Sequence, residues 1–146
     1  MVRDRSKSSN VLFELWRLSR AAGALLSDQL AGAGVTGDEF GIYSVLATVE
    51  HMTPSALARW MSAPATTVSS HVKRLEARGH VSRRPDPADG RSSLLRLTAA
   101  GRRTWERATA GYLPILAGVE ARLGAAEPEV RAALITLRAA IDATDR

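Results

Sequence analysis

The order of apolar and polar residues divides the chain into helical stretches separated by short segments rich in glycine, proline, serine and threonine. In the first stretch apolar residues recur every three or four positions, which predicts a helix over residues 11–31. Ser9 or Asn10 can cap its start, and Gly32 and Gly34 follow its end. A long amphipathic helix is therefore the first predicted element.

Two shorter helices come next. Thr36 and Glu39 have the capping-box spacing, in which each side chain accepts a hydrogen bond from the backbone N–H of the other residue. This spacing predicts a helix over about residues 37–49. Thr53 followed by Pro54 predicts a short third helix, because proline is favoured at the first helical position.

The hydrophobic period changes after the fourth helix, which opens at Pro64 and ends at Gly79. Residues 81–84 and 91–97 have the composition and alternation of β-strands. Residues 85–90 between them contain two prolines, two aspartates and a glycine, which are typical of turns. A β-hairpin with a long loop is expected here.

Helical spacing returns for the rest of the chain. Thr98 can cap a further helix, and Pro114 within that helix predicts a kink near residues 110–114. A proline starts a final helix over 128–143. Because there is no internal repeat and no low-complexity linker, the sequence predicts a single unit over 1–146, mainly α with a small antiparallel β-hairpin.

Composition narrows the class of protein. With 146 residues, 45% hydrophobic and 24% charged, the chain can bury a core and is expected to be globular and soluble. Met1 to Asn10 are polar and charged, and no run of eighteen apolar residues follows, so we expect no signal peptide, no membrane span and a cytoplasmic location. The formal net charge of +5 favours a polyanionic partner.

Redox and metal chemistry find little support in the sequence. There is no cysteine, which excludes disulfides and thiolate metal ligands. His51, His71 and His80 are the only histidines, and none has a second ligand at metal-binding spacing on the same helix face. We therefore expect neither a metal site nor a cofactor.

Two short helices followed at once by a hairpin have the order of a winged helix-turn-helix, whose second helix enters the major groove of DNA. At about 100° per residue, Val68, Val72 and Leu75 share one face of that helix. Hydroxyls that can approach base edges, and cations that can reach phosphates, lie on the opposite face and its flanks. These candidate DNA-binding residues are Thr66, Thr67, Ser70, Lys73 and Arg74.

For an isolated helix, such residues would more often be the solvated face of an amphipathic helix. The hairpin favours the DNA-binding interpretation. Asp89 stands two residues before Arg91, so that its carboxylate can orient the guanidinium for a narrow minor groove. Arg83 and Arg84 at the base of the hairpin add charge that can bind phosphate.

Three segments in this order resemble the MarR family of transcription regulators: VSSHVKRLEARGHV at 68–81, DPADGR at 86–91 and LTAAG at 97–101. They are similar to the recognition helix of the family, its wing and the start of its fifth helix. The resemblance implies DNA contacts at the helix residues named above and at Arg91. His71 stands where the family commonly has a core aliphatic residue, so it can touch phosphate or simply pack.

The resemblance also implies a homodimer whose first and last two helices interlock, and repression relieved by a small anionic or phenolic ligand. Residues 36–98 would form the winged helix-turn-helix, flanked by dimerisation helices in 10–35 and 99–146. A dimer also follows from the apolar stripes at both chain ends, which one small core is unlikely to cover. Two-fold symmetry would place the recognition helices roughly 34 Å apart on a pseudo-palindromic operator.

Aromatic residues on the predicted helices are candidates for an effector pocket. Trp16 and Tyr43 can line such a crevice, and Arg17 or Arg20 can meet an anionic ligand. Aromatics at helical spacing are more often part of a core, however, and exposed arginines usually face water.

Two other classes of function compete with a regulator. An enzyme would need a nucleophile with a base, or clustered carboxylates in a pocket, and the sequence offers neither. An architectural DNA binder without sequence preference would share the basic charge. A regulator differs from it by preferring its operator over random DNA by roughly 10³ or more.

Overall fold

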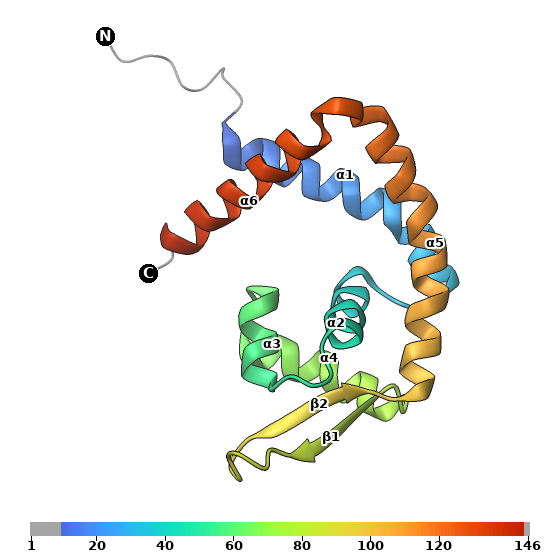
Figure 1. The fold of residues 1–146 in the computed structure, drawn as a ribbon, viewed down its shortest axis with the longest axis vertical. Coiled ribbons are helices and arrows are strands. Elements are labelled where there is room, and N and C mark those ends of the chain that lie inside the picture. Colours follow the sequence, from blue (N-terminus) through green and yellow to red (C-terminus); the bar gives the residue numbers. More distant parts are fainter. Residues whose placement is uncertain (1–9, 145–146) are drawn as a thin grey trace. The chain divides into compact units, whose positions relative to one another are not determined.

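In a computed structural model the chain is described over residues 10–144, and it is mainly helical with one two-stranded antiparallel hairpin (Figure 1). This confirms the predicted fold class. The elements in chain order are α1 (Val11–Gly32), α2 (Gly37–Thr48), α3 (Pro54–Met61), α4 (Ala65–Ala77), β1 (Val81–Pro85), β2 (Ser93–Leu97), α5 (Ala99–Leu123), the short 3₁₀ turn η1 (Gly124–Ala126) and α6 (Glu127–Thr144).

The described residues form two compact units, which divide between Tyr112 and Leu113. Pro114 lies inside α5, next to the boundary between the units and in the segment where a kink is predicted. The second unit consists of the end of α5, η1 and α6. Within it, no residue of α6 is buried. The periodicity of α6 predicts a helix correctly, but periodicity carries no information on how many neighbours cover that helix.

Local capping explains where several helices begin. The Asn10 side chain accepts a hydrogen bond from the backbone three residues on, whereas Ser9, the alternative cap, lies outside the described residues. The capping box of Thr36 and Glu39 is present, with N···O distances of 3.2 and 3.3 Å. Thr53 caps α3 in the same way at 3.2 Å. These caps satisfy N–H groups that the helix itself leaves free.

The start of α4 has no such cap. Its N-cap residue is Pro64, which offers no side-chain hydrogen bond, and the preceding turn passes through Ser62 in the left-handed conformation with φ 50°. The helix therefore begins at Ala65, one residue later than predicted, and it ends at Ala77, ahead of Gly79 with φ +69°. Backbone N–H groups at the first turn of α4 are left without a side-chain acceptor.

The core of the first unit surrounds α2. Helices α3 and α4 and strand β2 pack around it, and the end of α1 closes it at Leu30. The buried apolar residues that form this core include Ile42, Tyr43, Leu46, Leu57, Val68, Val72, Leu75, Val81, Leu95 and Leu97. Three of them come from α4, so the inner face of α4 is as the sequence predicts.

The hairpin is anchored at both of its edges. Val81 pairs with Leu97 and Arg83 with Leu95 across the antiparallel ladder. On the other side of β2, Met52 and Leu95 exchange backbone hydrogen bonds of 3.0 and 2.8 Å. The base of the wing is thus held by the loop between α2 and α3 as well as by α4.

The turn from β2 into α5 closes against the end of α4. Thr98 donates its hydroxyl to the carbonyl of Gly79 at 2.6 Å, and its backbone N–H reaches the carbonyl of His80 at 3.0 Å. A Cβ atom at Gly101 would lie 2.1 Å from that His80 carbonyl oxygen. Glycine is therefore required at this point because the α5 backbone approaches so closely. Within residues 10–144, no helix has the length and apolar character needed to cross a bilayer.

Gly101→Ala should lower the free energy of unfolding by about 2–3 kcal/mol, because the added methyl overlaps a backbone carbonyl that has no room to move. Urea denaturation of the variant and wild type measures this difference. Gly23→Ala is the matched control: Gly23 lies inside α1 with open space at its Cβ position, so alanine should stabilise by roughly 0.5–1 kcal/mol. Equal stability of Gly101→Ala and wild type would contradict the close approach.

Candidate nucleic-acid interface

The outward face of α4 is exposed and polar. Thr66, Thr67, Ser70 and Lys73 are all exposed, and the inner face of the same helix is buried in the core. No side chain among the described residues makes a hydrogen bond or ion pair to Thr66, Thr67 or Lys73 in this structure. These groups are free to bind an external partner, and the uncapped start of α4 adds backbone donors beside them.

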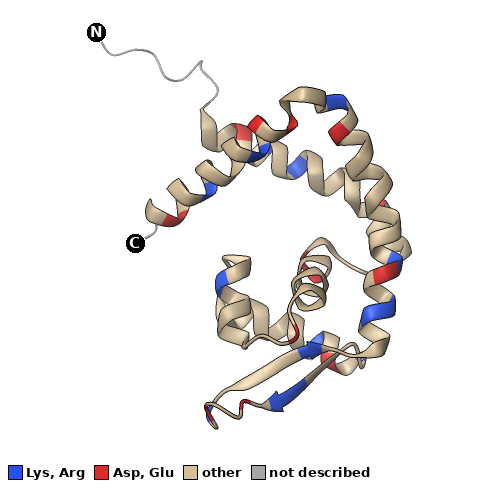
Figure 2. Cartoon of the chain, in the orientation of Figure 1, with Lys and Arg blue, Asp and Glu red and all other residues tan. Residues whose placement is uncertain are grey.

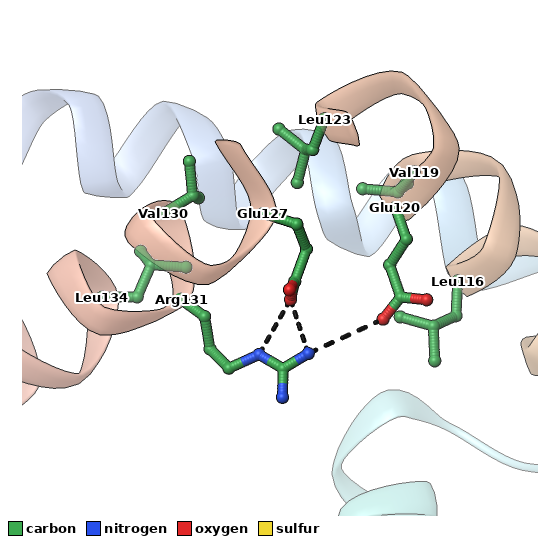
Figure 3. Close-up of a pocket in the computed structure, with 8 residues that line it drawn as sticks. All are labelled: Leu116, Val119, Glu120, Leu123, Glu127, Val130, Arg131 and Leu134. Atoms are coloured by element: carbon green, nitrogen blue, oxygen red, sulfur yellow. Dashed lines mark hydrogen bonds and ion pairs between the residues drawn. The ribbon is translucent and has the colours of Figure 1, made fainter. Parts of the chain in front are cut away.

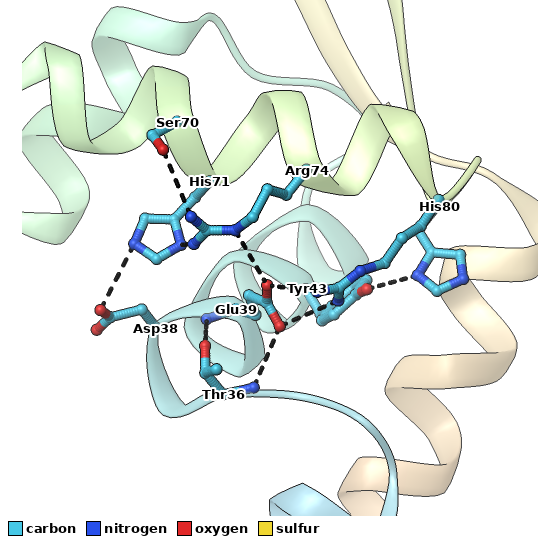
Figure 4. Close-up of polar contacts among 9 residues, drawn as sticks. Thr36, Asp38, Glu39, Tyr43, Ser70, His71, Arg74 and His80 are labelled. Atoms are coloured by element: carbon cyan, nitrogen blue, oxygen red, sulfur yellow. Dashed lines mark hydrogen bonds and ion pairs between the residues drawn. The ribbon is translucent and has the colours of Figure 1, made fainter.

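The sequence predicts the same role for Arg74 as for Lys73, but the two side chains are placed differently. Its guanidinium turns back toward α2: Nη2 lies 2.7 Å from His71 Nδ1 and Nε lies 3.8 Å from Glu39 Oε1. Nη1 also donates to Ser70 Oγ at 3.4 Å (Figure 4). In this structure the Arg74 guanidinium is paired within the protein while its side chain stays 50% exposed, so its role as a phosphate contact stays a prediction.

His71 is part of the inner face of α4. Only 9% of the residue is exposed, and its ring lies between Arg74 and the carboxylate of Asp38, with Nε2 3.6 Å from Oδ2. Of the two roles open to it in the sequence, contact with phosphate or packing, this placement is packing. The ring connects α4 to the first turn of α2 (Figure 4).

A buried carboxylate holds α4 against α2. Glu39 is 1% exposed, and Arg78 donates to both of its oxygens, at 3.2 Å to Oε2 and 3.1 Å to Oε1. The backbone of Thr36 donates to Oε2 as well. Burial alone would raise the pKa of Glu39, but the Thr36 hydrogen bond and the guanidinium groups of Arg78 and Arg74 together lower that pKa below its ordinary value.

The pairing of Glu39 with Arg78 is not predicted by the sequence pattern. In the sequence Glu39 stands out only as a member of a capping box, and Arg78 only as a residue within the segment 68–81. One feature could have indicated it: Glu39 stands on a helix whose other inward residues are apolar, and a carboxylate in that position needs a cation. The identity of the cation, 39 positions away, could not be read from the pattern.

Tyr43 belongs to the core rather than to a ligand crevice. It is fully buried, and its hydroxyl lies 2.6 Å from His80 Nδ1. Burial raises the pKa of Tyr43 and, together with the nearby Arg78 and Arg107, lowers the pKa of His80. No surface of the Tyr43 side chain is accessible in this conformation, so its role in an effector pocket stays a prediction.

The other two pocket candidates lie on α1. Trp16 is 59% exposed and stacks on Phe13 with ring centroids 5.8 Å apart, and Arg20 is exposed one turn further along. The structure thus does not bring Trp16 and Arg20 together with Tyr43 at one surface. Trp16 and Arg20 remain predictions for an effector site.

Asp89 shapes the backbone of the wing tip. Its Oδ1 accepts a hydrogen bond from the backbone N–H of Arg91 at 3.0 Å, and its carbonyl accepts one from Ser92 at 2.8 Å. The sequence predicted instead that this carboxylate orients the guanidinium of Arg91. A short aspartate side chain two residues upstream reaches the backbone N–H more readily, which is the geometry of an Asx turn. The exposed Arg91 guanidinium has no hydrogen bond or ion pair to the described residues.

Of the two arginines of β1, one is free of side-chain partners among the described residues and the other is paired, as with Lys73 and Arg74. Arg84 is exposed and has no side-chain partner within residues 10–144. Arg83 donates from Nε to Glu76 Oε1 at 3.0 Å and from Nη1 to Ser93 Oγ at 3.0 Å. Figure 2 shows basic residues along β1 and at the tip of the wing, but only part of this charge is free.

A pocket of about 370 Å³ lies in the second unit, between the end of α5 and α6 (Figure 3). Arg131 bridges its acidic side chains: Nε donates to Glu127 at 2.8 Å, and Nη2 lies 3.9 Å from Glu120. Its apolar lining residues are Leu116, Val119, Leu123, Val130 and Leu134. This pocket is an open apolar surface with one ion-pair cluster.

Comparison with known proteins agrees with this geometry. A sequence model described as the MarR family matches residues 33–92. The chain is 29% identical over 97 residues to an uncharacterised HTH-type transcriptional regulator, YdgJ of Bacillus subtilis strain 168, a match covering 66% of this chain. That match spans 57% of the length of YdgJ.

Two solved structures resemble the whole fold. The transcriptional regulator MosR of M. tuberculosis, in complex with DNA, has a TM-score of 0.81 at 26% identity and covers 93% of this chain and 98% of its own. The PcaV transcriptional regulator of Streptomyces coelicolor, in complex with its natural ligand, has a TM-score of 0.79 at 26% identity, covering 93% of this chain and 94% of its own.

Glu39→Gln should lower the free energy of unfolding by roughly 1–3 kcal/mol at neutral pH, because the amide keeps the shape of the side chain but loses the charge that pairs with Arg78. The folded state lowers the pKa of Glu39, so the stabilisation is complete above the unfolded-state value of about 4.3. It is lost as the pH falls through the lower folded-state pKa. The stability difference between variant and wild type should therefore shrink in strongly acidic buffer.

Urea denaturation at neutral and acidic pH measures both effects. Asp38→Asn is the control, since Asp38 is a neighbouring carboxylate of α2 whose side chain is 71% exposed. Its neutralisation should cost at most about 1 kcal/mol. A stability difference for Glu39→Gln that stays constant down to low pH would show that the charge of Glu39 is not what stabilises the fold.

Proposed function

We propose that the chain is a member of the MarR family of transcription regulators, and that it binds a pseudo-palindromic operator in double-stranded DNA as a homodimer and represses transcription there. Bound over a promoter, such a dimer would exclude the polymerase. We propose no enzymatic activity, because the members of this family are DNA-binding regulators.

The observation that supports DNA binding best is the exposed polar face of α4 beside an unpaired arginine at the wing tip. Thr66, Thr67 and Ser70 present hydroxyls of the kind that approach base edges in the major groove, with Lys73 behind them for phosphate. Arg91 presents a free guanidinium of the kind that enters a narrow minor groove. MosR, whose fold this chain shares, is described in complex with DNA.

Homodimer formation is supported by exposed apolar surface at both ends of the chain. On α1 the exposed large apolar residues are Val11, Leu12, Phe13, Trp16, Leu18 and Leu25, each about half exposed or more. On the end of α5 and on α6 they are Leu113, Val119, Val130, Leu134, Ile135 and Ile141. Monomeric proteins rarely leave so much apolar surface in water, and a two-fold partner would cover it.

A small-molecule effector completes the proposal. PcaV is described with its natural ligand bound, and exposed Trp16 and Arg20 of this chain offer an aromatic surface and a cation for an aromatic acid. We propose that such a compound releases the protein from its operator. The DNA-binding measurement below, repeated with aromatic acids, tests this part.

Wild-type protein should prefer a duplex selected from a random pool over unselected DNA by roughly 10³ or more, which separates a regulator from an architectural binder. Arg91→Ala should weaken binding to the selected duplex by about 1–3 kcal/mol with folding unchanged. Arg103→Ala, which removes the same charge from an exposed arginine of α5, is the control and should have a smaller effect. Fluorescence anisotropy measures all three, and unchanged affinity of Arg91→Ala would remove the wing from the mechanism.

Leu134→Glu should convert the dimer to monomers, because it places a charge on the exposed apolar face of α6. Light scattering coupled to size-exclusion chromatography gives the mass directly. Glu129→Lys alters an exposed charged residue of the same helix and should leave the mass of a dimer. A wild-type protein with the mass of a monomer at micromolar concentration would contradict the proposed assembly.

A further inference from the structure

The register of the hairpin places Arg83 on its inner face. Directly opposed residues of an antiparallel pair lie on the same face of the sheet, and side chains alternate between faces along each strand. Arg83 pairs with Leu95, which is fully buried, and it stands two residues from buried Val81. Arg84, the next residue, lies on the opposite face; its partner Leu94 is also buried, but the Arg84 side chain is exposed.

On that inner face Arg83 joins three elements. Its Nε donates to Glu76 of α4 at 3.0 Å, and its Nη1 donates to Ser93 at the start of β2 at 3.0 Å. The side chains of Arg83 and Glu76 are 40% and 29% exposed, so this ion pair is partly shielded from water. The guanidinium is held at two of its nitrogens rather than extended into solvent.

The tip of the wing hydrogen-bonds to itself. At the tip, Asp86 donates to the Ser92 carbonyl at 3.0 Å and Ser92 donates to the Asp89 carbonyl at 2.8 Å. These bonds fix the shape of the loop but not its direction relative to α4. Contacts that bear on this direction lie nearer the base of the hairpin, where Met52 pairs with Leu95 and where Glu76 and Arg83 connect the last turns of α4 to the middle of β1.

We propose that Arg83 and Glu76 are positioning residues that set the angle between the recognition helix and the wing, and that Arg83 is not a ligand of phosphate. The inference rests on the proposed DNA-binding function and adds to it a determinant of how both grooves are engaged at once. Helix and wing must reach adjacent grooves of one rigid duplex, so an error in their relative angle removes the wing contact while leaving the helix contact possible.

Glu76→Gln separates the two roles of Arg83. If Arg83 bound phosphate, removing the nearby acidic charge would leave DNA affinity equal or raise it, because DNA is a polyanion. If the pair sets the wing angle, Glu76→Gln should weaken binding to a duplex selected by the wild-type protein by roughly three- to tenfold. Arg83→Gln should weaken binding by a similar factor, and the double variant by little more than either single change.

The salt dependence of binding gives the second readout. A lost phosphate contact lowers the slope of log K against log salt by about 0.9. Arg84→Gln, on the outer face of the same strand, is the matched comparison and should lower the slope by that amount. Glu76→Gln removes no cation, so a slope that falls in Glu76→Gln as far as it falls in Arg83→Gln reports displacement of the wing rather than a lost contact between Arg83 and phosphate. Thermal melting of each variant confirms that the fold is retained.

A double-mutant cycle with Arg91→Ala distinguishes wing positioning from general stability. In the Glu76→Gln background the wing is misplaced, so Arg91→Ala should cost several times less affinity than it does in the wild-type background. An undiminished cost of Arg91→Ala would overturn the proposal. So would Glu76→Gln binding as tightly as wild type while Arg83→Gln lowers the salt slope by about 0.9.

The contacts of Arg83 with Glu76 and Ser93 are here called the clamp. Hydrogen exchange of the free protein tests this clamp without DNA. Glu76→Gln should speed exchange of the hairpin amides in residues 83–95, and Arg84→Gln should not. Faster exchange in a protein that shows no preference for any selected duplex would refute the proposed function while leaving the clamp in place. Unchanged exchange together with unchanged affinity would refute the clamp itself.

Discussion

The buried carboxylate of Glu39 is the constraint on which the DNA-binding unit depends. It is 1% exposed, so it must be paired, and the two donors of Arg78 and the backbone of Thr36 satisfy it. Because Thr36 and Glu39 begin α2 and Arg78 follows the last turn of α4, this one group fixes both helices. His71 and Asp38 add a second connection between them nearer the start of α4.

This arrangement also determines which cations are available to a partner. Arg74, Arg78 and Arg83 all lie near the outward face or the wing, yet their guanidinium groups are bound to Glu39 or Glu76. Lys73, Arg84 and Arg91 keep their charge free of such partners among the described residues. The net charge of +5 therefore overstates the charge offered at the interface, and the internal pairs serve to orient the free ones.

Apolar side chains near the chain ends are much less covered than those in the core around α2. In the core around α2, Tyr43, Leu57 and Leu75 are fully covered by their neighbours. By contrast, α6 has no buried residue, and Trp16 on α1 is 59% exposed to water. Apolar helical periodicity is equally clear in both regions. A second copy of the chain is the simplest cover for the surfaces at the ends, which is why homodimer formation is part of the proposed function.

The sequence by itself determined what short-range chemistry controls. The cap at Asn10, the capping box at Thr36, the inner face of α4 and the hairpin all occur as predicted, because each depends on neighbours within a few positions. Tertiary structure decided the rest. Whether Arg74 and Arg83 face DNA or a carboxylate, and whether Tyr43 lines a crevice or the core, depends on residues that folding brings close from distant positions, and side-chain type alone does not specify these neighbours.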